Sequence, residues 1–235
     1  MRVKYTIIGL WVLLLTMVSG EWSMINAQVI IGGNVYGGGN QGNVGGGSSV
    51  TIRAGNLHNV FGGARMANVG GSALVNIDGA HASDYILIDK VYGGNDIAGS
   101  IGSSEDLPSV LTDATANDID NTWNAFVHLS CSTYTAEEIG AASEGDDAYD
   151  KTAGSAKTDN QKVYIGQLFG GGNGDYDYTS EKVLNTSGDE EDNPYYNLTK
   201  PELAKTVVEI HGGRIVYAYG GGNNATVTEK TVICV

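Results

Sequence analysis

The sequence contains few residues of several kinds, and each shortage excludes a class of protein. Only 3 of its 235 residues are proline, so its 35 glycines do not indicate a collagen-like or proline-rich chain. Two cysteines, Cys131 and Cys234, are too few for a disulfide framework, and the sequence does not decide whether they pair. With 13 basic residues against 27 acidic ones, and no Lys or Arg cluster, the chain would repel phosphate backbones, so we expect no binding to nucleic acid.

Residues 1–27 have the pattern of a secretory signal peptide. Arg2 and Lys4 precede a nearly unbroken apolar run over residues 7–18, and small residues follow. The run is shorter than the roughly 20 residues of a membrane span. We therefore predict cleavage after Ala27 or after Gly20, with a retained membrane anchor as the alternative. The mature chain, 28–235, is expected to be secreted or displayed on the outer-membrane surface without spanning a membrane.

One pattern recurs along the chain and predicts its fold. Residues 50–63 and 208–221 share an apolar pair two residues apart, a glycine, a second apolar pair, and an aromatic residue followed by Gly-Gly. Shorter copies that end in an aromatic residue and Gly-Gly occur at 35–38, 91–94 and 168–171. The intervals between copies are close to 25 residues or to multiples of it. This predicts an all-β fold, a parallel β-helix or β-solenoid of about five coils.

Within each repeat, alternation predicts which residues face the core. Val50 and Ile52 share one face of a strand, Gly55 permits a corner, and a second strand begins near Leu57. The position three residues before the apolar–aromatic pair is apolar in four copies, which should stack as a ladder: Leu57, Ile88, Ile165 and Ile215. Residues 226–235 read as a further strand, whose apolar end favours a chain that continues.

Two acidic segments depart from the repeat and are predicted as loop insertions in the domain 28–235. Residues 103–162 hold twelve acidic residues and three lysines, a net charge of −9. Residues 173–205 hold eight acidic residues and three lysines, a net charge of −5. The repeats are nearly neutral, so the insertions are the place to seek a binding surface; the alternative is that they only keep the protein soluble.

Motifs for bound ions or nucleotides are weak. Gly37-x-Gly39-x-x-Gly42 matches a dinucleotide fingerprint, but a strand follows it where that motif needs a helix. Residues 171–175 approach a calcium-binding nonapeptide with the aspartate out of register, so we expect no cofactor beyond weak calcium binding by Asp175, Asp177 and residues 189–192. The four histidines show no paired spacing typical of zinc, which leaves any metal ligand unknown.

The aromatic residues of the repeats are the remaining candidate ligand surface. They occupy one repeat position: Tyr36, Phe61, Tyr92, Phe169 and Tyr219. Exposed, they would form a stripe suited to sugar rings; buried, they would be an interior stack, which the exchange of Phe and Tyr favours.

The repeat phrase of residues 50–63 and 208–223 resembles that of Gly-rich parallel β-helix, adhesin-like proteins, secreted or surface-exposed in gut Gram-negative bacteria. The resemblance covers residues 29–102, 163–172 and 206–235 and implies architecture more than activity. No catalytic residue follows from it.

We therefore expect a non-enzymatic secreted or cell-surface protein that acts in adhesion or binds a cell-surface glycan or protein. The alternative is a polysaccharide-active β-helix enzyme, a lyase or glycoside hydrolase, for which Asp118 and Asp120 would be candidate carboxylates. A repeat without any ligand is a third reading. The sequence leaves the oligomeric state open.

Overall fold

The computed structural model describes residues 29–82, 85–104, 122–134 and 161–235, with residue 136 and the backbone of residues 149–150 and 155–156. These residues form fourteen β-strands: β1 (Ile30–Tyr36), β2 (Ser48–Ile52), β3 (Gly55–Phe61), β4 (Ala73–Gly79), β5 (Ile86–Tyr92), β6 (Ala125–Cys131), β7 (Tyr149–Asp150), β8 (Ser155–Ala156), β9 (Val163–Phe169), β10 (Lys182–Leu184), β11 (Glu190–Asp192), β12 (Glu202–His211), β13 (Arg214–Tyr219) and β14 (Thr226–Cys234). Within the described ranges, no helix has the length and apolar character needed to cross a membrane. The predicted signal peptide, 1–27, lies outside them.

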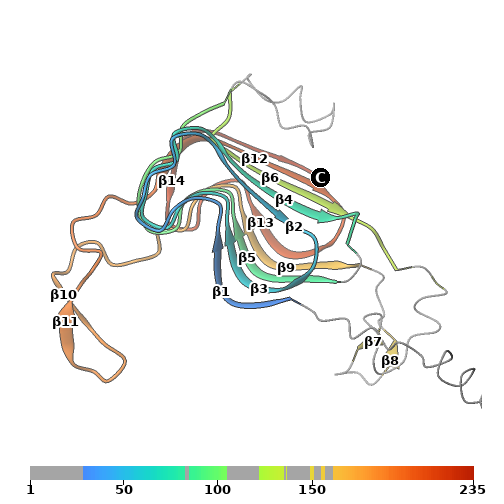
Figure 1. Ribbon diagram of the computed structural model, residues 1–235, viewed down its shortest axis with the longest axis horizontal. Helices are drawn as coiled ribbons and strands as arrows, with labels where there is room; N and C mark the ends of the chain where they lie inside the picture. Colours follow the sequence, from blue (N-terminus) through green and yellow to red (C-terminus); the bar gives the residue numbers. More distant parts are fainter. Residues whose placement is uncertain are drawn as a thin grey trace, which may run out of the picture.

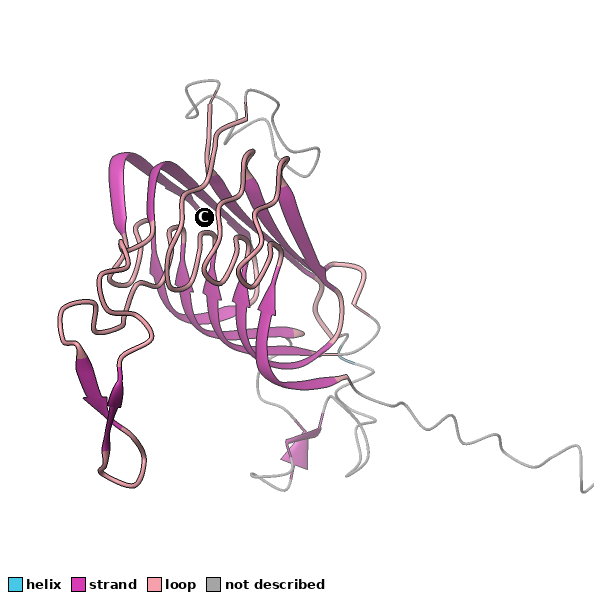
Figure 2. Cartoon of the chain, turned by 60° about the vertical axis from the view of Figure 1, so that its left-hand side comes forward, coloured by secondary structure: helices cyan, strands magenta, loops and turns pink. Residues whose placement is uncertain are grey.

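Ten of the strands form two parallel sheets of five strands each, stacked as two layers (Figure 1). The first sheet has the order β1-β3-β5-β9-β13, and the second has the order β2-β4-β6-β12-β14. Along the chain, strands of one sheet alternate with strands of the other. The hairpins β7–β8 and β10–β11 are separate antiparallel pairs, and β10–β11 stands away from both layers (Figure 2).

The core lies between the two sheets because alternate residues of each strand face inward. In β2 the side chains of Val50 and Ile52 are buried while Thr51 between them is exposed. Residues that share a register position in neighbouring strands continue these rows across the second sheet, with Val75 beside Val50 and Ile77 beside Ile52. The predicted ladder in the first sheet is confirmed, since each residue pairs with the next: Leu57, Ile88, Ile165 and Ile215.

The glycines that follow each aromatic residue allow neighbouring strand ends to approach closely. A Cβ on Gly62 would lie 2.5 Å from the carbonyl oxygen of Gly93, and a Cβ on Gly93 would lie 2.3 Å from that of Gly170. Both separations are shorter than any Cβ contact tolerates. The Gly-Gly pair is therefore a steric requirement of stacking one strand end on the next. The predicted corner at Gly55 has a φ of 114°, which glycine adopts at little cost.

The predicted fold class, a β-solenoid of about five coils with acidic loop insertions, is wrong and is corrected to a fold of two five-stranded parallel sheets with two small antiparallel sheets. The assumed 25-residue period misplaced the strands. Val91 and Leu168 were counted as three periods apart, but they are direct neighbours on β5 and β9. Leu168 and Ala218, counted as two periods apart, are also direct neighbours. Sequence spacing includes every inserted residue, whereas sheet order depends only on which strands pair.

The two acidic segments also contribute structure that a loop would not. The segment 103–162 contains β6, the central strand of the second sheet, which agrees with the apolar run around Phe126. The segment 173–205 contains the hairpin β10–β11 and the first residues of β12.

Candidate functional site

The five aromatic residues predicted as a ligand surface form a continuous stack at the ends of the strands of the first sheet. Successive ring centroids lie 4.7–5.0 Å apart with interplanar angles of 5–14°. Phe61, Tyr92 and Phe169 are buried, with exposed fractions of 4% or less. Tyr36 is half-buried and Tyr219 is 44% exposed. Burial raises the pKa of Tyr92, and the nearby charge of Asp96 adds to the effect. Only the two ends of the stack are therefore open to a ligand.

Asp96 lies beside this stack and joins it to the second acidic segment. Its side chain is 1% exposed. The Tyr36 hydroxyl donates a 2.7 Å hydrogen bond to Oδ2, the Tyr176 hydroxyl donates a 2.8 Å bond to Oδ1, and Asn173 Nδ2 donates a 2.9 Å bond to Oδ1. Burial raises the pKa of Tyr36 to about 12, with the Asp96 carboxylate contributing. The carboxylate thus holds three side chains from two distant parts of the chain.

We call residues 173–198 the acidic arm. Its base packs on the framework through a cluster of aromatic residues in which Tyr176 lies edge-on to Tyr178 and Tyr195. The Tyr178 hydroxyl donates to the carbonyl oxygen of Ile97. The arm carries seven acidic residues and one lysine, a net charge of −6. In both ribbon views, β10–β11 projects beyond the sheets (Figures 1 and 2).

The carboxylates predicted to bind calcium weakly serve local structure instead of gathering around one point. Asp177 Oδ1 accepts hydrogen bonds from the backbone N–H groups of Thr179 and Ser180, and its pKa is lowered by its hydrogen bonds to these two residues. Asp192 pairs with Lys182 across the hairpin. Within the part of the chain that the structure describes, neither belongs to a cluster of three candidate metal ligands. Asp118 and Asp120 lie outside the described residues.

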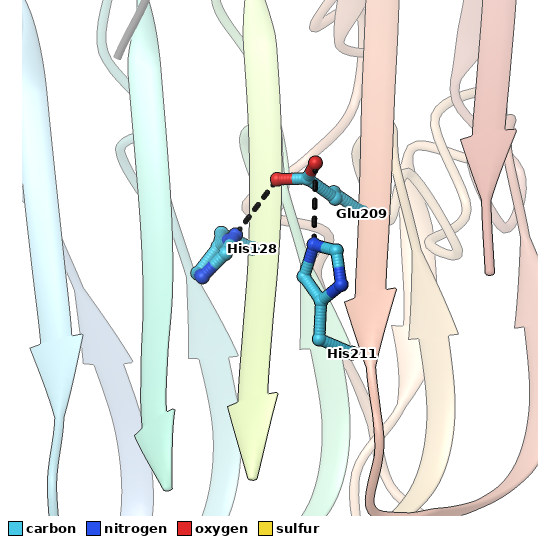
Figure 3. Close-up of side chains that lie close together, drawn as sticks. All are labelled: His128, Glu209 and His211. Carbon is cyan, nitrogen blue, oxygen red and sulfur yellow. Dashed lines mark hydrogen bonds and ion pairs between the residues drawn. The ribbon is translucent and has the colours of Figure 1, made fainter. Parts of the chain in front are cut away.

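A cluster that the sequence did not predict lies on the outer face of the second sheet. Glu209 on β12 accepts a 2.9 Å contact from His128 Nδ1 on β6, and its other carboxylate oxygen lies 3.2 Å from His211 Nε2 (Figure 3). Glu209 is fully buried, the side chain of His128 is nearly so, and that of His211 is 42% exposed. The three ligand atoms lie within 4.8 Å of one another.

The fold explains why sequence reasoning missed this cluster. His128 and Glu209 are 81 residues apart and meet only because β6 and β12 pair with these residues in register. One part of the pattern was visible: Glu209 and His211 are two residues apart in a strand, which places them on one face. The remaining ligand could not be assigned without the register.

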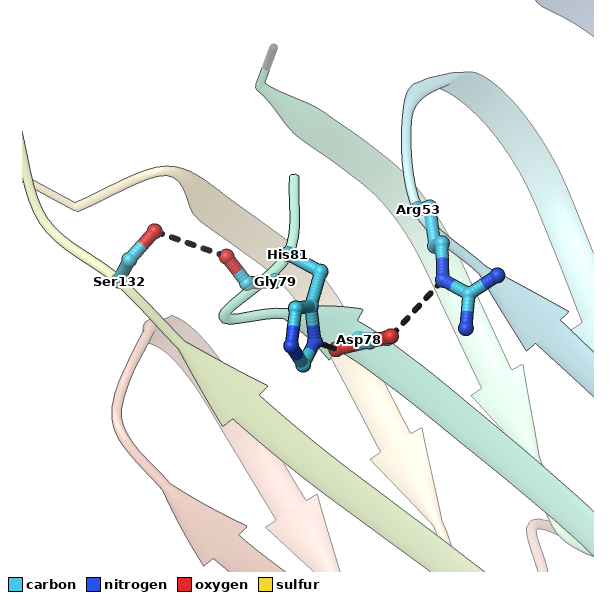
Figure 4. Close-up of polar contacts among 5 residues, drawn as sticks. All are labelled: Arg53, Asp78, Gly79, His81 and Ser132. Carbon is cyan, nitrogen blue, oxygen red and sulfur yellow. Dashed lines mark hydrogen bonds and ion pairs between the residues drawn. The ribbon is translucent and has the colours of Figure 1, made fainter. Parts of the chain in front are cut away.

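A second polar cluster closes the end of β4. Asp78 accepts a 2.8 Å hydrogen bond from Arg53 Nε and contacts His81 Nδ1 at 2.7 Å, while the Ser132 hydroxyl donates to the carbonyl oxygen of Gly79 (Figure 4). Burial of Asp78 acts to raise its pKa, but the hydrogen bonds from His81 and Arg53 outweigh it, so the pKa is lowered. The cluster has one carboxylate and one histidine, and its contacts are those of a structural ion pair.

In comparisons with known proteins, no protein-family model, no curated protein and no solved structure matches this chain.

Proposed function

We propose that this protein is a non-enzymatic, extracellular, adhesin-like binding protein that recognises a cell-surface glycan or protein through the acidic arm. The observation that carries the proposal is the arm, an acidic projection fixed to a regular two-sheet framework. The signal-peptide pattern of residues 1–27 supports a role outside the cytoplasm.

The arm has the rigidity that a recognition element needs at its base. Asp96 holds Asn173 and Tyr176, and Asn193 Nδ2 donates to the carbonyl oxygens of Asp177 and Ser180, which closes the neck of the hairpin. Binding elements that are already ordered lose less conformational entropy when a partner binds. A solubilising loop would not require this number of buried hydrogen bonds.

The surface of the arm combines exposed apolar side chains with carboxylates. Leu184 is 70% exposed, and Tyr196 and Leu198 are each more than a third exposed. Glu190 and Glu191 are exposed on the neighbouring strand. Apolar and aromatic side chains pack against sugar rings or apolar patches, while carboxylates accept hydrogen bonds from hydroxyl or amino groups. The negative charge favours neutral or basic partners and disfavours acidic polysaccharides.

The test compares binding of the mature chain, residues 28–235, with that of variants altered only in the arm. Because Asn193 N–H donates to the Glu181 carbonyl oxygen, residues 182–192 can be replaced by a short Gly-Ser turn without disturbing the anchored base. Leu184→Ser is the point variant, and Val216→Ser, 63% exposed on β13, is its matched control. Immobilised glycan and cell-surface protein arrays, each with and without calcium, are the readout.

We expect saturable binding by the mature chain, loss of binding in the hairpin replacement, and at least about tenfold weaker binding in Leu184→Ser, as for a central interface residue. Val216→Ser should bind normally. Equal binding by the hairpin replacement would refute the arm as the recognition element. Absence of binding on both arrays would contradict the proposed function and favour a purely structural role. The polysaccharide-cleaving alternative rests only on Asp118 and Asp120, outside the described residues.

A further inference from the structure

We infer that His128, Glu209 and His211 form a binding site for a divalent transition-metal ion, with zinc as the representative ion. The inference is independent of the arm and of any surface ligand. It rests on the register of the second sheet, the separations of three ligand atoms, the burial of one carboxylate and an unsatisfied acceptor next to the cluster.

The sheet places the three side chains on one face without strain in the surrounding strands. Glu209 and His128 occupy paired register positions on β12 and β6. His211 follows Glu209 by two residues, so its side chain leaves the same face of β12. The inward residues that flank them, such as Val208 and Ile210, belong to the core between the sheets. The cluster is thus held by two central strands and not by loops.

The observed separations are close to those of a tetrahedral metal site. With bonds of about 2.0–2.2 Å from zinc to nitrogen and oxygen, neighbouring ligand atoms lie roughly 3.3–3.5 Å apart. The two contacts to the Glu209 carboxylate measure 2.9 and 3.2 Å, and all three ligand atoms lie within 4.8 Å. A small rotation of the more exposed His211 ring would bring the two histidine nitrogens to this spacing around an ion.

The burial of Glu209 supplies the energetic reason for a cation. Its side chain has an exposed fraction of 0%, and an ionised carboxylate removed from water is strongly destabilising unless a positive charge compensates it. Neutral imidazoles can contribute ligands but no charge. A divalent ion would neutralise Glu209 and would use the nitrogen lone pairs of His128 and His211 at the same time.

A neighbouring residue has an acceptor that fits the water of such a site. Asn76 on β4 occupies the register position beside His128. Its Oδ1 atom is buried and accepts no hydrogen bond from any residue in the described ranges. Three protein ligands leave one position of a tetrahedral ion open, and a water bound there could donate a hydrogen bond to this oxygen. His211, 42% exposed, leaves the cluster accessible from solvent.

The donor set selects the class of ion. Calcium and magnesium require about six or more oxygen ligands, of which this cluster offers one carboxylate. Two imidazoles and one carboxylate suit zinc and its first-row neighbours. The site is therefore distinct from the weak calcium binding expected of the acidic segments.

The test uses the full mature chain, stripped with a chelator and titrated with Zn²⁺ by calorimetry. We expect one equivalent to bind, a raised melting temperature, and no comparable binding of Ca²⁺ or Mg²⁺. Replacing zinc with Co²⁺ should give the visible absorption bands of a tetrahedral nitrogen–oxygen site. His211→Ala, chosen because this side chain is partly exposed, should weaken zinc binding at least about tenfold, the lower end of the loss found for groups that merely orient ligands.

His58→Ala is the matched control, because His58 is also half-exposed and also contacts a carboxylate, that of Asp89 at 2.7 Å. It should bind zinc as the unaltered chain does. Circular dichroism of the metal-free variants separates misfolding from ligand loss, and His128→Gln provides a second ligand variant of similar size. The inference is overturned if the stripped chain binds no zinc, or if His211→Ala and His58→Ala reduce binding equally. It is also overturned if bound Co²⁺ gives only the weak spectrum of an octahedral aqua ion.

Discussion

The hydroxyl of Tyr36 donates a 2.7 Å hydrogen bond to the carboxylate of Asp96, sixty residues further along the chain. Tyr36 is the first ring of the aromatic stack, and Asp96 also holds Tyr176 at the base of the acidic arm. One buried carboxylate therefore connects the edge strand of the first sheet, the turn after β5 and the arm. The position of the arm depends on this residue more than on any contact along the arm itself.

Replacing Asp96 with alanine should destabilise the protein by about 2–3 kcal/mol, because the hydroxyls of Tyr36 and Tyr176 would lose a charged acceptor in a largely buried site. The arm should become sensitive to limited proteolysis while the sheets remain protected. Asp96→Asn, which keeps one acceptor oxygen, should lose less. Asp89→Ala is the control: this aspartate also contacts a side chain, but both partners are more than half exposed, so its loss should stay below about 1 kcal/mol. Equal losses for Asp96→Ala and Asp89→Ala, measured by urea unfolding, would contradict the proposed role.

The Gly-Gly pairs permit a direct test of the close approach between strand ends. Gly93→Ala should destabilise the protein by about 2–3 kcal/mol, because the new Cβ would lie 2.3 Å from the Gly170 carbonyl oxygen and the backbone must move. Gly46→Ala adds the same methyl group where no atom lies within 4 Å. Its effect should be within about 0.5 kcal/mol of zero. A similar loss in the two variants would show that backbone entropy, and not crowding, explains the glycines.

Local features of the fold could be predicted from the sequence because they depend on neighbours in the chain. Alternation placed Val50 and Ile52 on the inner face, and the apolar ladder through Leu57 and Ile88 is confirmed by the register. The glycine after Ile52 and the Gly-Gly pairs also marked their turns correctly. Each of these signals arises within a few residues of the position that it predicts.

Features that depend on pairing between distant segments could not be predicted in this way. The period of 25 residues failed between Val91 and Leu168, because 76 residues intervene between two directly paired positions. The contact between His128 and Glu209 requires the register of β6 and β12. The anchoring of the arm by Asp96 joins side chains about 80 residues apart. Nothing in the local sequence of these residues marks their partners.

The two cysteines should remain unpaired thiols in the folded protein. Cys234 lies beside Glu209 in the register of the second sheet, whereas Cys131 lies three residues beyond His128, two strands away. Three residues along a strand and two strand spacings each amount to about 10 Å, well beyond the roughly 7 Å limit for the two Cα atoms of a disulfide. Thiol titration of the denatured, unreduced protein should therefore find two thiols, and one in Cys131→Ser. Absence of both thiols without a covalent dimer would contradict this register.

The ion pairs of Asp78 should make stability depend on acid pH. Hydrogen bonds from His81 and Arg53 outweigh the effect of burial and lower the pKa of Asp78 in the folded protein, so between the folded and unfolded pKa values the unfolded chain binds more protons. The stabilisation is complete above the ordinary aspartate pKa of about 3.9 and is lost as the pH falls through the lower, folded value. Urea unfolding should therefore show Asp78→Asn less stable than the unaltered chain at pH 6, with a difference that shrinks below about pH 4. In an Arg53→Gln background the same substitution should cost less at pH 6, because one of the two partners is already absent. A difference that stays constant from pH 6 to pH 3 would mean that Asp78 contributes through packing and not through its charge.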